Sequence, residues 1–455
     1  MTDIRPFKLT DESIPYRREY MIKKPISILL SLILTAALTA CAGNGSTPAP
    51  SPENTDTSIE GSVPEENKEG PAEETEEKAE EVEESDDLHI GIVTGSYSQS
   101  EDDRRGAEAF QDKFGQDKVT LAIYPDNFTE EPEVTIQTMV NLSEDPKMKA
   151  IIVNQAVDGT AEAFRRIKEK RPDILCIACE AYEDFSDIAP VADLVVCSDF
   201  VVRGYLMIRT AHELGCDTFV HISFPRHLSY ESVSRQVAIM KAACEEFGMR
   251  FEMEEAPDPT TDVGVPGAQS FILEHVPGWV EKYGEKSAYF CTNDAHTEPL
   301  IKKLLECGGY FIEADLPSPL MGYPGALDLD LTKEAGDFEK ILDSVEKAVV
   351  EKDGAGRFGT WAYSYGYTCS AGLAEHAKNV LSGESDLLNI EDISRAYSVF
   401  SPKAEWSGAM YTDAETGERS DNILLIYQDT YIMGDPGYYM GSTDVKVPEK
   451  YFRIK

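Results

Sequence analysis

Short apolar runs alternate with amphipathic helical stretches from residue 88 onward, and this alternation constrains the fold more than any other feature. Alternating strands and helices predict parallel sheets with helices on both faces. Near-continuous apolar strands are typical of such sheets because both of their faces are buried. We therefore predict an α/β protein whose strands are HIGIVTG, TLAIYP, AIIVNQA, ILCIACE, DLVVCSD, FVHISF, RFEMEEA, AYFCTND and YFIEADL.

Polar residues follow these runs at the points where the strands end. In open parallel sheets, ligands bind beyond the carboxyl ends of the strands, where helix N-termini also point. Two such edges that face each other would form a polar cleft. We therefore predict ligand contacts from the strand ends of a first set, Ser96, Asn154, Gln155, Glu180 and Asp199, and of a second set, Asn293, Asp294 and Asp315.

Two further candidates for ligand binding come from the segments SFPRHLSYE and RFGTWAYSYGY. Arg226 lies just beyond a strand end, where its planar fork could bind a carboxylate or a pair of hydroxyls. It could equally form an ion pair within its own loop. The ring of Trp361 could stack on a ligand or pack inside the hinge. We keep both residues as candidate ligand contacts.

The segment FCTNDAHTEP could be taken for a metal or catalytic cluster. A helix that begins after Asn293 would splay Asp294, His296 and Glu298, and the N-terminus of a helix disfavours cations. We therefore predict no metal site and no cofactor. The segment AYSYG lacks the first glycine of a nucleophile elbow, and no phosphate-binding glycine loop follows the first strand. These patterns predict a protein that is not an enzyme.

The N-terminal part of the chain has the features of an export signal and a tether. The segment KKPISILLSLILTAALTAC combines lysines, an apolar stretch and small residues, as secretory signals do. Leu38–Cys41 resembles the lipobox of bacterial lipoproteins, so we expect a signal in residues 1–40 and lipidation of Cys41. Met21 is an alternative start. Residues 44–87 hold 16 acidic and 2 basic residues and few large apolar side chains, so we predict a disordered tether over residues 41–87.

The net charge and the positions of the cysteines limit which partners and which cysteine chemistry we expect. A formal net charge of −41 repels phosphate backbones, so we predict no nucleic-acid binding. The cysteines beyond Cys41 lie mostly within apolar runs, which predicts buried thiols. The lone Cys176-x-x-Cys179 has no second pair to complete a zinc site.

Several segments, in order, resemble the type I periplasmic-binding proteins: ADLVVCSDFVVRGYLMIRTAHELGCDTFVHIS, SRQVAIMKAACEEFGM, FCTNDAHTEPLIKKLLECGG and SYGYTCSAGLAEHAKNVLSGE. The phrases HIGIVTGSYSQSEDD, SFPRHLSYE and APDPTTDVGV are similar to a family of bacterial lipoproteins that carry a domain of unknown function. The resemblance implies two Rossmann-like lobes. It also implies that Asn293 contacts the ligand from the second lobe, that Asp199 and Asp315 line the cleft or hinge, and that Ser96, Ser98 and Gln99 close over the ligand.

These observations lead to an expected organisation and function. We expect residues 88–199 plus 320–385 in the first lobe and residues 200–319 plus 386–455 in the second. The predicted protein is extracytoplasmic, contacts the membrane only through its lipid anchor, and captures a small polar ligand such as a sugar or a nucleoside. It would present this ligand to an ABC-type permease. The alternatives are a sensor lipoprotein without a transport role and an enzyme on the same scaffold.

Overall fold

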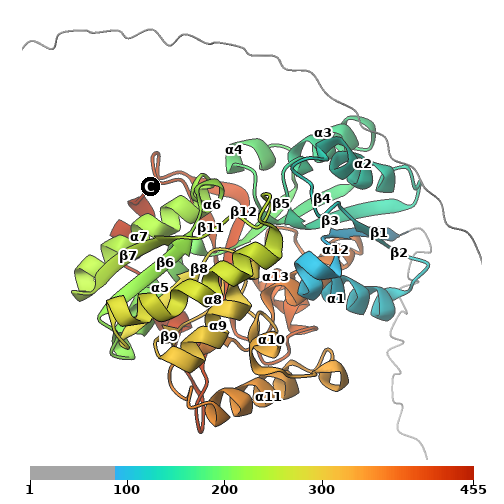
Figure 1. The fold of residues 1–455 in the computed structure, drawn as a ribbon. Coiled ribbons are helices and arrows are strands. Elements are labelled where there is room, and N and C mark those ends of the chain that lie inside the picture. The colour runs from blue at the N-terminus through green and yellow to red at the C-terminus, as the bar shows by residue number, and fades with distance from the viewer. Residues whose placement is uncertain (1–87) are drawn as a thin grey trace, which may run out of the picture. The chain divides into compact units, whose positions relative to one another are not determined.

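The first sheet contains seven strands in the order β11-β12-β5-β4-β3-β1-β2 (Figure 1). The computed structural model describes residues 88–455. Neighbouring strands pair in parallel, except that β11 runs antiparallel to β12 at one edge. The central strands are buried along most of their length, which explains their near-continuous apolar sequences. The strands are β1 (His89–Thr94), β2 (Val119–Ile123), β3 (Met148–Ala156), β4 (Leu175–Ala181), β5 (Leu194–Ser198), β11 (Trp406–Thr412) and β12 (Arg419–Gln428).

Helices cover both faces of this sheet (Figure 1). One face carries α1 (Tyr97–Phe114), α12 (Tyr365–Leu381) and α13 (Ile390–Ser398), and the other carries α2 (Pro132–Leu142), α3 (Thr160–Lys170) and α4 (Phe185–Ile188). The close approach of α1 and α12 depends on Gly106, because a Cβ atom there would lie 2.2 Å from the carbonyl oxygen of Tyr367. This crossing brings the first turns of α1 and α12 together at the carboxyl ends of the strands.

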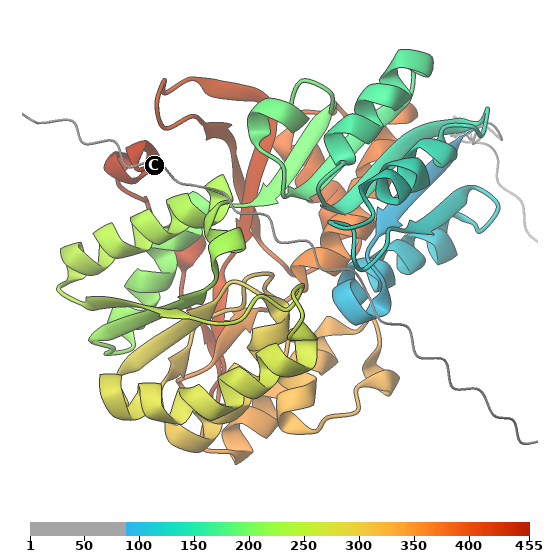
Figure 2. The same ribbon diagram turned by 45° about the horizontal axis from the view of Figure 1, so that its top comes forward.

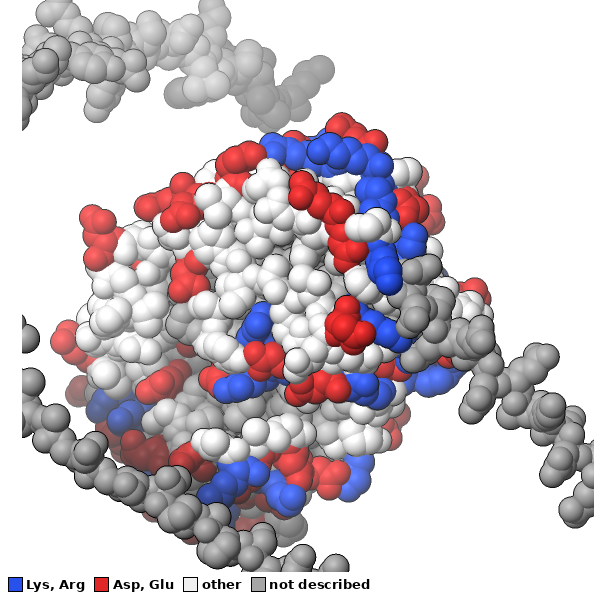
Figure 3. Space-filling view, turned by 90° about the vertical axis from the view of Figure 1, so that its right-hand side faces the viewer, with Lys and Arg blue, Asp and Glu red and all other residues white. Residues whose placement is uncertain are grey.

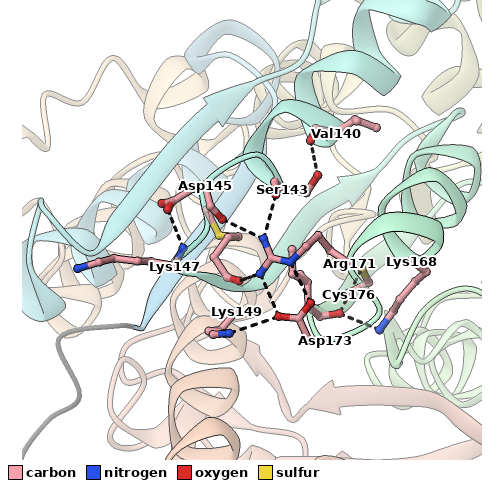
Figure 4. Close-up of polar contacts among 11 residues, drawn as sticks. Val140, Ser143, Asp145, Lys147, Lys149, Lys168, Arg171, Asp173 and Cys176 are labelled. Carbon is pink, nitrogen blue, oxygen red and sulfur yellow. Dashed lines mark hydrogen bonds and ion pairs between the residues drawn. The ribbon is translucent and has the colours of Figure 1, made fainter.

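Arg171, which follows α3, forms hydrogen bonds with the segments that precede β3 and β4, at the end of the sheet opposite the carboxyl ends of the strands (Figure 4). Its guanidinium donates hydrogen bonds to the carbonyl oxygens of Ser143, Asp145 and Met148 at 3.2, 3.1 and 3.0 Å. It also pairs with Asp173 at 2.9 Å. Carbonyl groups at the C-terminal end of a helix lack hydrogen-bond partners within the helix. The Arg171 side chain therefore supplies hydrogen bonds to the carbonyl groups of the segment that follows α2.

The second sheet is wholly parallel and has the order β7-β6-β8-β9. Successive residues of its strands face two different apolar clusters, as the strand period of two requires. Phe219 and Phe290 join the core that continues from the first lobe, whereas Val220 and Tyr289 join a separate cluster. The elements are β6 (Thr218–Ser223), β7 (Arg250–Glu255), β8 (Ser287–Cys291) and β9 (Tyr310–Phe311), with helices α5 (Phe200–Glu213), α7 (Glu231–Phe247), α8 (Gly264–Tyr283) and α9 (Asp294–Cys307).

A small third sheet, β10-β13-β14, adjoins the second through a bridge between Phe311 and Phe358. The C-terminal segment, red in Figure 2, runs from β12 in the first sheet to β13 in the third. The chain thus passes between the lobes after β5, between β10 and α12, and after β12. The remaining elements are α6 (Pro225–Leu228), α10 (Tyr323–Leu327), α11 (Phe338–Glu351), β10 (Gly359–Trp361), β13 (Thr430–Ile432), β14 (Tyr438–Tyr439) and the 3₁₀ helices Thr332–Glu334, Ser442–Asp444 and Glu449–Arg453.

The predicted α/β fold is confirmed, and the nine predicted strands are β1 to β9. The strand pairing differs from the expected division into lobes at two places. β11 and β12 were expected in the second lobe with residues 386–455, but β12 pairs with β5 in the first sheet. Conversely, α10 and α11 were expected in the first lobe, but α10 packs against α9 and α11 in the second.

Three further features bear on the sequence-based expectations. Residues 1–87, which contain the predicted signal, Cys41 and the acidic tether, lie outside the described residues. Among the described helices, none combines the length and the apolar character that crossing a membrane requires. The eight described cysteines are free thiols, and all but Cys307 are buried, so the prediction of buried thiols is confirmed for the other seven.

Candidate functional site

A cavity of about 880 Å³ lies between the two lobes, at the carboxyl ends of their parallel strands. The first lobe lines it with Tyr124, Gln155 and Tyr182, which end or follow β2, β3 and β4. The second lobe lines it with Asn293 after β8 and with the loop of residues 320–336 around α10. The volume falls within the roughly 300–1,000 Å³ of small-molecule sites. The cavity is therefore the candidate ligand site.

A second cavity of about 70 Å³ adjoins the first and shares Asn293 and Asp294 with it. Arg203 of α5 and Glu180 at the end of β4 contribute to its wall, as does Asp315 beyond β9. The two cavities together contact strand ends of both sheets, which is where the sequence predicts ligand contacts.

The structure brings six of the predicted site residues to these cavities. Gln155, Arg226, Asn293 and Asp294 line the larger one, and Glu180 and Asp315 line the smaller one. The side-chain amide of Gln155 donates a hydrogen bond to Asp103 Oδ2 at 3.2 Å, while its carbonyl oxygen accepts one from Tyr182. Asn293 also caps α9, since its side chain accepts a hydrogen bond from the backbone NH of Ala295 at 3.0 Å.

Arg226 and Glu180 are held by neighbouring groups within their own lobes. Arg226 forms a two-pronged pair with Asp258 at 2.7 and 3.0 Å and donates to the Tyr230 hydroxyl at 3.0 Å. The loop ion pair that the sequence left open is therefore present. Glu180 accepts hydrogen bonds from the backbone NH of Ser198 at 2.8 Å and from the Tyr365 hydroxyl at 2.6 Å. Both side chains reach the cavities from fixed positions.

Three predicted contacts point away from the cavities. Asn154 is 1% exposed, and its amide donates to Ser370 Oγ of α12 at 2.8 Å inside the first lobe. Asp199 is buried and caps α5 by accepting hydrogen bonds from the backbone NH groups of the helix at 3.1 and 2.8 Å. Trp361 has no exposed surface and lies among core aromatic rings. None of these three lines either cavity, so their predicted contact with a ligand is corrected to a structural role.

The residues predicted to close over the ligand lie at the start of α1. Ser96 occupies the N-cap position of α1, and its hydroxyl donates to Asp126 Oδ1 at 2.6 Å. Asp126 itself lines the larger cavity. Ser98 and Gln99 belong to the first turn of α1, and their side chains lie outside the description.

Four residues of the cavity wall, on α1 and on the loops after β2 and β4, were not predicted from the sequence. Asp102, Asp103, Tyr124 and Tyr182 all line the larger cavity. The acidic stretch SEDDRR has the composition of a solvated helix face, and no motif distinguishes its two aspartates from exposed ones. Their neighbour Gln155, which was predicted, was the available signal, because parallel strand ends lie beside the first turn of the following helices.

Carboxyl groups from the two lobes line the larger cavity and act on one another. Burial and then the charge of Asp102 raise the pKa of Asp103 to about 7. Burial and then the charges of Asp103 and Asp102 raise the pKa of Asp294 to about 7. In the smaller cavity, burial raises the pKa of Asp315 to about 8, although Arg203 opposes this shift. These carboxyl groups carry a proton more readily than exposed ones do.

Replacing Asp294 with asparagine is expected to stabilise the ligand-free protein at pH 8 by about 1–2 kcal/mol. The pKa of Asp294 is about 7 in the folded protein, above an unfolded value of about 3.9. Between these values the folded chain holds a proton that the unfolded chain has released, so the free energy of unfolding falls as pH rises through this window. Urea unfolding at pH 5 and pH 8 measures the difference between the two proteins.

The matched control is Asp421→Asn, because Asp421 is exposed on β12 and lines neither cavity. This variant makes the same charge change and is expected to alter stability by less than about 0.5 kcal/mol at either pH. Equal stability of Asp294→Asn and the unaltered protein at pH 8 would contradict the proposed repulsion.

His296 and Ser364, from the two segments that could suggest metal or covalent chemistry, have hydrogen-bond partners within the protein. His296 is buried, with its Nε2 atom 3.0 Å from the carbonyl oxygen of Pro257. Within residues 88–455, no three His, Cys, Asp or Glu side chains are arranged to hold a metal ion. Ser364 of the segment AYSYG caps α12 and donates to Asp102 Oδ2 at 2.5 Å.

Two facing lobes with parallel sheets and a polar cavity between them define a two-lobed α/β protein with a candidate ligand site at its strand ends. Residues 88–359 match the family described as "Protein of unknown function (DUF3798)", and the chain belongs to this family. A further family model matches residues 370–454. An uncharacterized protein of Treponema pallidum (strain Nichols) is 41% identical over 212 residues, which are 47% of this chain and 96% of that protein.

Solved structures share the fold at low sequence identity. A protein from Clostridium difficile 630 with a proposed role as a transcriptional regulator has a TM-score of 0.64 and 20% identity, covering 76% of this chain and 99% of that one. A periplasmic solute-binding protein of an ABC transporter from Actinobacillus succinogenes 130z, with bound D-allose, has a TM-score of 0.45 and 13% identity. That match covers 66% of this chain and 93% of the other. The first of these similarities supports the two-lobed fold.

Proposed function

We propose that the chain is a lipid-anchored, extracytoplasmic solute-binding protein that captures a small polar ligand between its two lobes and presents it to a membrane transporter. The cavity of about 880 Å³ at the facing strand ends carries this proposal. Both lobes contribute polar side chains to it, among them Gln155 from the first lobe and Asn293 from the second. A ligand that contacts both lobes stabilises their closed arrangement over an open one.

The connections between the lobes support closure as the response to the ligand. The chain passes between them after β5, between β10 and α12, and after β12. Hinges are formed by a few residues at the ends of such elements, and they absorb the change in backbone angles while each lobe moves as a body. A transporter or a sensor protein can then recognise the closed arrangement. A sensor lipoprotein without a transport role is the alternative partner arrangement.

The sequence supports export and anchoring, and the histidine among the described cavity residues is a weak base. The apolar segment before Leu38–Cys41 has the pattern of a cleaved lipoprotein signal. A catalytic site would need a nucleophile, a base and a group that orients the base. His227 lines the larger cavity, but burial and the charge of Arg226 lower its pKa to about 4, and its Nδ1 atom lies 3.3 Å from Thr292 Oγ1.

A thermal-shift screen of the full chain against sugars, nucleosides, amino acids and amines tests the proposal. A ligand present at 100 times its dissociation constant is expected to stabilise the protein by about 2.7 kcal/mol. The variant Ala295→Trp places a large ring on the cavity wall without changing its charge, so it is expected to abolish the ligand-induced shift. The control Ala355→Trp alters an exposed residue outside both cavities and should retain the shift.

The outcomes separate the alternatives. Stabilisation that survives in Ala295→Trp would place the ligand elsewhere and reject this cavity. The absence of a thermal shift with any of the four ligand classes would reject solute capture as the function. Closure itself is measured by small-angle X-ray scattering, where the radius of gyration should fall when the ligand is added.

A further inference from the structure

The larger cavity holds far more acidic than basic side chains, and the acidic groups come from both lobes. Among the described residues that line it, the only lysine or arginine residues are Arg105 and Arg226. Its acidic residues are Glu101, Asp102, Asp103, Glu108, Asp112, Asp126, Asp294, Glu298 and Asp330. On the outer face seen in Figure 3, acidic and basic side chains are interspersed instead. The excess of carboxylates in the cavity is therefore a feature of the cavity wall and not of that surface.

Both arginines of the cavity are already paired with carboxylates. Arg226 forms its two-pronged pair with Asp258, which lies outside the lining of the cavity. Arg105 lies 3.5 Å from Glu101 and 3.6 Å from Glu108. Neither arginine forms an ion pair with Asp102, Asp103 or Asp294 among the described contacts. These three carboxylates thus form no ion pair with either arginine of the cavity among the described residues.

Three of these carboxyl groups line the same cavity from both lobes, and the charges of Asp103 and Asp102 act on Asp294. Asp103 of α1 is 3% exposed and accepts a hydrogen bond from the neutral amide of Gln155 at 3.2 Å. Asp102 accepts one from the Ser364 hydroxyl at 2.5 Å. The Asp294 carboxylate, at the start of α9, has neither a hydrogen bond nor an ion pair with a described residue. A buried charge without a counter-charge is costly, so a ligand that supplies one gains from it.

Aromatic rings complete the wall around these carboxylates. Rings attract ammonium groups through their electron-rich faces when they lie within about 6 Å. A sugar could also stack on such rings and donate hydrogen bonds to the carboxylates, but it brings no positive charge to offset theirs. The rings that line the cavity are Tyr97, Tyr124, Phe128, Tyr182, Phe338 and Tyr367.

We propose that the ligand of this cavity is a small organic cation, a diamine or polyamine, whose ammonium groups lie between Asp102 and Asp103 of the first lobe and Asp294 of the second. This inference rests on the proposed function and names its ligand class. The ammonium groups neutralise carboxylates from both lobes at once, so binding removes the repulsion that opposes closure. Discrimination against sugars follows because a neutral ligand can donate hydrogen bonds to these carboxylates but cannot neutralise their charges.

Isothermal titration calorimetry on the full chain at pH 8 and 150 mM salt tests this assignment with putrescine and spermidine against D-ribose and adenosine. We expect one equivalent of an amine to bind and the neutral ligands to give no heat. The variant Asp294→Asn is expected to weaken amine binding by at least tenfold. The control Asp421→Asn removes an exposed carboxylate outside the cavities and should bind within twofold of the unaltered protein.

Each contrary outcome has a distinct meaning. Several equivalents of amine, or equal weakening in both variants, would show attraction to the acidic surface and overturn the assignment. Binding of D-ribose or adenosine that Ala295→Trp abolishes would overturn the cationic ligand while retaining solute capture by the cavity. Absence of binding by amines and neutral ligands alike would reject the cationic ligand and count against the proposed function as well.

Discussion

Replacement of Trp361 by alanine is expected to lower the free energy of unfolding by about 3–5 kcal/mol, because it empties a buried site that surrounding residues cannot refill. Trp361 lies on β10 with no exposed surface. Its ring meets Tyr365 and Trp406 edge to face, at centroid distances of 5.9 and 6.0 Å. The guanidinium carbon of Arg203 lies 5.2 Å from the ring centroid. These contacts join β10, α12, β11 and α5 near the connections between the lobes.

Urea unfolding followed by tyrosine fluorescence and circular dichroism measures this effect. Trp361→Phe keeps an aromatic ring at the site and is expected to cost less than Trp361→Ala. The control Tyr438→Ala removes a ring that is 47% exposed and should change stability by less than about 0.5 kcal/mol. If Trp361→Ala left stability unchanged and weakened ligand binding, Trp361 would be a ligand contact and not a core residue.

Trp361 also shows why the sequence could suggest this residue but not assign its role. An aromatic-rich segment such as RFGTWAYSYGY has the same composition whether its rings pack in a core or line a cavity. Burial of the ring depends on Trp406, which lies far along the chain in a segment with no predicted strand. The prediction of strands needs only local apolar runs, so β1 to β9 were found, although the comparable run of β12 was not named as a strand.

The C-terminal strands illustrate the same limit for topology. The run ILLIYQ of β12 is as apolar as the predicted strands, but its sheet is decided by pairing with β5. Nothing within the run itself indicates that β5 is its partner strand. The expected assignment of residues 386–455 to the second lobe therefore differs from the structure although the segment contains a clear strand pattern.

The candidate site was predictable in location and less so in its members. Strand ends located the cavity because parallel strands present their carboxyl ends at one edge. The direction of each side chain was not available from the sequence. Asn154 and Gln155 are neighbours, yet Gln155 lines the cavity while Asn154 bonds to α12. Asp199 caps its helix, as strand-end aspartates often do.

Arg203 and Glu313 form an ion pair where the connections between the lobes meet. Arg203 Nε lies 2.9 Å from Glu313 Oε1, and the two side chains are 3% and 2% exposed. The guanidinium also donates to the carbonyl oxygen of Ala314 at 2.9 Å. Thr430 Oγ1, at the start of β13, donates to Glu313 Oε2 at 3.4 Å. The pair thus links α5, the segment after β9 and the start of β13.

Replacing Arg203 with methionine is expected to lower the free energy of unfolding by about 3–5 kcal/mol, since Glu313 remains buried without its partner. The double variant Arg203→Met with Glu313→Leu removes both charges and is expected to recover at least half of that loss, because burying a charge pair itself carries a desolvation cost. A double-mutant cycle in urea unfolding isolates the coupling between the two side chains. If the double variant lost as much stability as its two single variants together, the pair would contribute no coupling.

Arg203 also contacts Trp361, so the two side chains are expected to be coupled. The double variant Arg203→Met with Trp361→Ala should therefore lose less free energy of unfolding than the sum of the two single losses. Such coupling would show that the core ring and the buried ion pair stabilise the same hinge.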